Sequence, residues 1–165
     1  MMKKLIAALL IAVMVLTAAV ALAEQYEGED ITFTYDENAF EITTDEVDEG
    51  GHFVVLNAKE EAWGKTYIRF YVYMEEEDGQ FSSVESLQEL LPDIEITQGE
   101  WNGFNDVIMY NDGTEQLFLV PLTTGEQMTV GICVTEIEDE DVAMERDDQI
   151  SAVLDTLKIV ADAEG

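Results

Sequence analysis

The residues best suited to molecular recognition lie on one short segment, residues 66–74. Its side chains alternate with a period of two, which predicts a half-buried strand. One face is apolar, and the opposite face carries Tyr67, Arg69, Tyr71 and Tyr73. Tyrosine offers a large amphipathic contact area, and arginine adds a positive charge that is rare in this chain. This face is a candidate binding surface, although the layered packing of most domains favours the alternative that a helix or loop covers it.

Two tryptophans are further binding candidates. Trp63 and Trp101 each lie in a predicted loop with a glycine nearby. An exposed indole ring would suit recognition, but a loop tryptophan folded over the edge of the core is commoner. Both interpretations stay open from sequence alone.

The residues offer little support for catalysis. His52 is the only histidine, so a two-histidine metal site is excluded and a Ser-His-Asp arrangement could use only this residue. It follows two glycines at the start of a predicted strand, where we expect a partly exposed structural histidine. A pair of carboxylates could hydrolyse a glycoside, but the 37 Asp and Glu residues give no means of selecting the pair. A small secreted hydrolase that depends on carboxylates is therefore an alternative hypothesis.

A weak calcium site is a second alternative. Calcium prefers several hard carboxylate oxygens, and the segment that holds Asp139, Glu140 and Asp141 is among the densest acidic clusters. The segment lacks the spacing of a calcium-binding loop, and charged runs are usually solvated surfaces. We expect no other cofactor.

The charge balance restricts the possible partners. The net charge is −30, and removal of Lys3 and Lys4 with the first 23 residues leaves 5 − 37 = −32. The net charge of a small domain usually has a magnitude of about 2 to 8. Such an excess argues against nucleic acid and anionic lipid as ligands. The expected partner is an unidentified protein or extracellular ligand.

The first 23 residues have the pattern of a signal peptide. Two lysines precede the apolar residues 5–20, and Ala21-Leu22-Ala23 supplies the small side chains of a cleavage site. Cleavage would release a secreted, extracytoplasmic chain without a membrane anchor. Retention as an N-terminal anchor is the alternative, since residues 5–23 are just long enough to cross a bilayer.

Residues 24–165 are predicted to form a single α+β domain. Period-two segments joined by short turns predict an antiparallel sheet of about six to seven strands, rich in meanders. A mid-chain helix is expected after a capping box of Ser82 and Glu85, and it should stop at Pro92. A C-terminal helix follows from the spacing of Ile150, Val153, Leu154 and Leu157. The lone Cys133 lies in an apolar run and is expected to be a buried small hydrophobe.

Both ends of this region resemble a known family. The opening Tyr26-x-x-x-Asp30-Ile31-Thr32-Phe33-Thr34-Tyr35-Asp36 and the closing Ile150-Ser151-Ala152-Val153-Leu154-Asp155-Thr156-Leu157-Lys158, with the order of elements between them, are similar to PsbP-like proteins, including small DcrB-like bacterial proteins. The resemblance implies an antiparallel sheet flanked by helices and a non-enzymatic assembly or binding role. Our interpretation of the sequence is a secreted, non-catalytic binding or accessory module at the exterior of a bacterial cell.

The mature chain should begin at Glu24. Replacing Ala23 with Phe should block processing, because signal peptidase accepts only small side chains at this position. Intact-mass measurement of protein from the culture medium checks both statements. A cell-bound product that retains Met1 would contradict the prediction.

Overall fold

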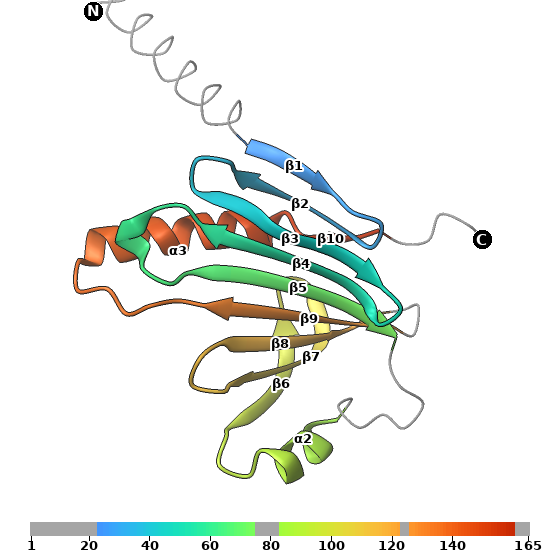
Figure 1. Ribbon diagram of the computed structural model, residues 1–165. Coiled ribbons are helices and arrows are strands. Elements are labelled where there is room, and N and C mark those ends of the chain that lie inside the picture. Colours follow the sequence, from blue (N-terminus) through green and yellow to red (C-terminus); the bar gives the residue numbers. More distant parts are fainter. Residues whose placement is uncertain (1–22, 75–82, 123–125, 161–165) are drawn as a thin grey trace, which may run out of the picture.

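The computed structural model describes residues 23–74, 83–122 and 126–160, which form two antiparallel sheets and two α-helices (Figure 1). The large sheet has seven strands, in the spatial order β3 (Phe40–Asp48), β4 (Gly51–Ala58), β5 (Tyr67–Met74), β9 (Glu126–Cys133), β8 (Gln116–Pro121), β7 (Phe104–Asn111) and β6 (Ile96–Trp101). The small sheet consists of β1 (Ala23–Glu27), β2 (Ile31–Asp36) and β10 (Lys158–Ile159). The predicted antiparallel α+β class is confirmed.

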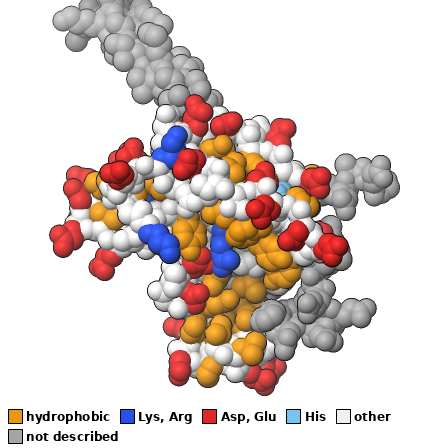
Figure 2. All heavy atoms as spheres, in the orientation of Figure 1, with side chains coloured by type: hydrophobic (Ala, Val, Ile, Leu, Met, Phe, Trp, Pro, Cys, Tyr) orange, Lys and Arg blue, Asp and Glu red, His pale blue; other side chains and the backbone are white. Residues whose placement is uncertain are grey.

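Acidic side chains lie along much of the molecular margin, whereas hydrophobic side chains gather near the centre of the face shown in Figure 2. This face includes the outer side of β4 and β5, meaning the side that carries Arg69. The opposite, inner side carries Ile68 and Phe70. Within the described part of the chain, no helix has the length and apolar composition needed to span a membrane.

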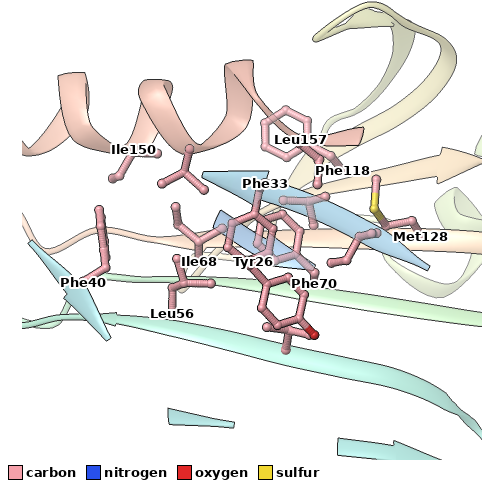
Figure 3. Packing of buried hydrophobic residues seen from close by; sticks show 14 of the residues in the cluster. Tyr26, Phe33, Phe40, Leu56, Ile68, Phe70, Phe118, Met128, Ile150 and Leu157 are labelled. Carbon is pink, nitrogen blue, oxygen red and sulfur yellow. The ribbon is translucent and has the colours of Figure 1, made fainter. Parts of the chain in front are cut away.

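The main core lies against the inner side of the large sheet. Phe33 of β2 stacks on Phe70 of β5 with ring centroids 5.0 Å apart, and Ile150 and Leu157 close the same cluster (Figure 3). These side chains are almost completely buried. Removing a side chain of this kind from water contributes about 1.5 to 3 kcal/mol. The period-two spacing and the helical spacing of Ile150 therefore predicted core-facing positions correctly, whereas Leu157, which we expected within the C-terminal helix, follows its end at Asp155.

The small sheet is a feature that the sequence analysis missed. We expected one antiparallel sheet, but β2 pairs with β1 and β10 in a sheet of their own. Local alternation predicts that a segment is a strand, but not which segment hydrogen-bonds to it. The small sheet covers the inner side together with α3 (Glu140–Asp155).

Helix α2 (Val84–Leu90) lies on the outer side, where Leu87 packs against Ile108 and Leu119. The predicted capping residue was wrong by one position: Ser83 is the N-cap, and its Oγ accepts a hydrogen bond from the Ser86 amide at 3.1 Å. Ser82 lies outside the described residues. The short 3₁₀ turn η1 (Glu61–Trp63) precedes β5.

His52 is buried rather than partly exposed, contrary to the sequence-based expectation. Its Nδ1 lies 3.2 Å from Oδ2 of Asp30, and its Nε2 lies 3.0 Å from Oδ1 of Asp45. The Tyr26 hydroxyl lies 3.0 Å from the same Nε2 and donates to Asp45. The histidine thus joins the small sheet to β3 and β4.

Replacing His52 with Leu should lower the free energy of unfolding by about 1 to 3 kcal/mol, because the Leu side chain cannot hydrogen-bond to Asp30, Asp45 or Tyr26. Urea denaturation measures the change. The matched control is Asn38→Ala, which removes a side chain that also binds a carboxylate, that of Asp36, but in an exposed turn. The control should change stability by less than about 0.5 kcal/mol. Equal effects of the two substitutions would contradict the role assigned to His52.

Candidate functional site

Tyr67, Arg69, Tyr71 and Tyr73, here called the tyrosine face, all project from the outer side of β5. The alternate side chains of the strand, those of Ile68, Phe70 and Val72, are buried on the inner side. The predicted division of the strand into two faces is therefore confirmed. The four outer side chains are half-buried. Of the described helices, α2 packs on β6 to β8 and α3 packs on the inner side. Neither helix covers the tyrosine face, contrary to the alternative that the layered packing of most domains favoured.

The aromatic rings at one end of the tyrosine face are fixed in position. Tyr71 stacks on Tyr73 with centroids 4.8 Å apart, and Phe53 of β4 meets Tyr71 edge-on at 5.9 Å. The Tyr71 hydroxyl donates to the Gly50 carbonyl at 3.1 Å, and the Tyr73 hydroxyl donates to Gln127 Oε1 at 2.7 Å. Rings held in this way lose little conformational entropy when a partner binds.

An ion pair lies at the other end. Oε2 of Glu115 accepts from Arg69 Nη2 at 2.6 Å and from Nε at 2.9 Å, while the Tyr67 hydroxyl donates to Oε1. The Glu115 side chain is only 8% exposed, whereas that of Arg69 is 33% exposed. Burial, followed by the hydrogen bond to Glu115, raises the pKa of Tyr67. Tyr67 therefore remains a neutral hydroxyl donor at neutral pH.

Two local features of the sequence make this ion pair possible. Gly131 of β9 lies opposite Arg69, and a Cβ atom on Gly131 would stand 2.6 Å from Arg69 Nε. In the turn between β7 and β8, Asp112 Oδ1 accepts from the amides of Thr114 and Glu115, each at 2.8 Å. These backbone hydrogen bonds lower the pKa of Asp112 and fix the start of β8. The turn thereby directs Glu115 over the sheet.

A shallow hollow of about 400 Å³ lies between these groups, lined by Phe53, Val55, Asn57, Lys65, Tyr67, Arg69 and Glu115. Lys65 Nζ lies 5.6 Å from the centroid of the Tyr67 ring and forms no ion pair with a described carboxylate. The formal charge of the three ionic groups is +1 + 1 − 1 = +1, in a chain of net charge −30. Figure 2 shows Lys and Arg side chains beside the central hydrophobic patch.

The other predicted site residues lie elsewhere. Trp63 is 3% exposed and packs on Phe40, and Trp101 stacks on Phe118 with centroids 4.1 Å apart. Both indoles belong to the inner core, so the structure does not bring them to the tyrosine face. Cys133 is buried, as expected.

The acidic segment at 139–141 forms the start of α3. Asp139 is the N-cap, and its Oδ1 accepts from the amides of Asp141 and Val142 at 3.1 and 3.3 Å. Glu140 and Asp141 occupy the first helical turn, where negative charge is favourable. No three His, Cys, Asp or Glu side chains come together as a metal site within the described ranges. Weak calcium binding stays a prediction.

Sequence analysis missed five residues of the hollow: Phe53, Val55, Asn57, Lys65 and Glu115. The alternation in residues 53–56 could have placed the first two on one face. Glu115 gave no such signal, because its partners Arg69 and Tyr67 are 46 and 48 positions away. No family model and no curated protein matches the chain, so its function is inferred from this geometry.

Removing the Arg69 guanidinium should leave the Glu115 carboxylate buried without its counter-ion. We expect Arg69→Met to lower the free energy of unfolding by about 2 to 3 kcal/mol, less than for a fully buried pair because Arg69 is partly exposed. Neutralising the carboxylate as well, in Arg69→Met/Glu115→Gln, should recover more than half of the loss. Urea denaturation of the two single variants and the double variant measures the coupling. Additive losses would contradict the interaction.

Proposed function

We propose that the chain is a secreted, non-catalytic binding module, and that its binding surface consists of the tyrosine face and the adjoining hollow. The observation that carries this proposal is the combination of fixed aromatic rings with an open, mostly apolar hollow on a surface that neither α2 nor α3 covers. Aromatic residues and arginine contribute most to binding energy in protein recognition. A surface organised before binding also reduces the entropic cost.

The hydrolase alternative has less support. Glycoside hydrolysis uses two carboxyl groups about 5 to 9.5 Å apart across the substrate. The hollow contains one carboxylate, that of Glu115, and both of its oxygens accept hydrogen bonds from Tyr67 and Arg69. A carboxylate held in this way is poorly placed to accept a proton from water or a substrate.

The proposed location outside the cytoplasm rests on the signal-like residues 1–23, of which 1–22 lie outside the described part of the chain. The resemblance to PsbP-like and DcrB-like proteins favours the same role of a binding or accessory protein. The net charge of −30 supports a ligand other than nucleic acid or anionic lipid.

The proposal predicts that partner capture depends on the tyrosine face. Immobilised purified protein should retain a component of the surface fraction of the producing cells. Tyr71→Ala/Tyr73→Ala should weaken retention by at least about 30-fold, because central tyrosines at interfaces often contribute 2 kcal/mol or more.

Tyr35→Ala is the matched control, since it removes a half-buried tyrosine of β2 whose hydroxyl binds Glu24. Circular dichroism and thermal unfolding should show that all variants remain folded. Retention that is equal for the wild type and the folded double variant would refute the tyrosine face as the binding surface.

A further inference from the structure

The hollow has the size and lining of a small-molecule site. Its volume of about 400 Å³ lies within the range of about 300 to 1,000 Å³ that is typical of such sites. Phe53, Val55 and the ring of Tyr67 provide apolar surface, and the ionic groups lie at one side of it. A ligand that fits should therefore have a compact apolar body and one polar end.

The hydrogen bonds around Arg69 indicate the charge of that polar end. Glu115 occupies Nε and Nη2 of the guanidinium, whereas Nη1 has no hydrogen-bond partner among the described residues. Lys65 Nζ is also without a carboxylate partner in the described chain. Two cationic donors at one hollow are uncommon in a region that has only five Lys and Arg residues. They complement a carboxylate.

The same contacts disfavour a cationic ligand. Both oxygens of Glu115 already accept hydrogen bonds, from Tyr67 and from Arg69. These donors leave the carboxylate little capacity for a ligand ammonium group, which would also lie close to the positive charges of Arg69 and Lys65. A ligand with several negative charges is also disfavoured, because the net charge of −30 repels it. A ligand with a single carboxylate is not cationic and carries only one negative charge, so it avoids both disadvantages.

We propose that this hollow binds a small amphipathic monocarboxylic acid. The carboxylate lies between Lys65 Nζ and Arg69 Nη1, and the apolar body lies on Phe53, Val55 and Tyr67. This inference rests on the proposed binding function and names the class of ligand for one part of the surface.

Three probes with the same apolar body test the charge preference: 2-naphthoate, 2-naphthalenemethanol and 2-naphthylmethylammonium. Titration of the purified protein, followed by amide chemical shifts, should give a Kd of about 0.1 to 1 mM for naphthoate. The alcohol should bind about tenfold more weakly, the loss expected when one charge-assisted hydrogen bond is removed. The shifts should map to β4, β5 and the turn before β8. Tightest binding of the ammonium probe, or no binding of naphthoate, would overturn the proposal.

Lys65→Gln provides the decisive variant, because the hydrogen bonds of Lys65 to Thr135 and Cys133 are accepted by its backbone carbonyl, while its Nζ lies over the Tyr67 ring. It should weaken naphthoate about tenfold and leave the alcohol unchanged. Lys59→Gln, which makes the same charge change outside the hollow, should alter neither affinity. An equal effect of the two substitutions would attribute the preference to net charge and overturn the site. Val55→Phe should fill the hollow and weaken both naphthoate and the alcohol.

A peptide with a C-terminal Phe, with its carboxyl group free or amidated, separates this ligand from a polypeptide. Binding of the free-acid peptide without binding of naphthoate would overturn the small-acid proposal and leave the tyrosine face intact as a polypeptide surface. Capture of the cellular partner that depends on Tyr71 and Tyr73, together with no response to naphthoate, would likewise refute the ligand class alone.

Discussion

The buried carboxylate of Glu115 is the constraint on which the outer side of the large sheet depends. A carboxylate removed from water needs a counter-ion or several donors, and this one has Arg69 and Tyr67. Their reach across β9 requires a residue without a side chain, which is why Gly131 lies opposite Arg69. The ion pair therefore connects β5 to the turn before β8, beside the half-buried apolar side chains of β4.

The few cations in this acidic chain occupy specific places. Arg146 is buried, donates to the Thr135 carbonyl at 2.6 Å and pairs with Asp147, so it holds the first half of α3 to the segment that follows β9. Arg69 neutralises Glu115. Lys59, Lys65 and Lys158 form no ion pair with a described carboxylate, and of these three lysines only Lys65 lines the hollow, where its Nζ lies over the Tyr67 ring. Its positive charge beside that of Arg69, in an acidic chain, distinguishes the hollow from an ordinary surface depression.

The sequence predicted features that depend on local periodicity. Alternation in residues 66–74 correctly separated Phe70 from Arg69, and helical spacing placed Ile150 in the core. Local periodicity does not predict long-range pairing. β2 pairs with β1 and β10 and not with a strand of the large sheet, and His52 hydrogen-bonds to carboxylates from two other segments. Glu115 was missed for the same reason. A single polar residue after a turn carries no sign of the strand that it will contact.

The groups in the hollow favour recognition over proton transfer. The Glu115 carboxylate accepts hydrogen bonds from Arg69 and Tyr67 and is itself almost completely buried, so it is poorly placed to meet a substrate proton, and the raised pKa of Tyr67 keeps its hydroxyl protonated. The same contacts hold the rings and the guanidinium in fixed positions, which reduces the cost of ordering them when a ligand binds. The hydrogen bonds of Glu115 and Tyr67 thus organise the surface around them. This fixed geometry supports the binding role that we propose for the surface.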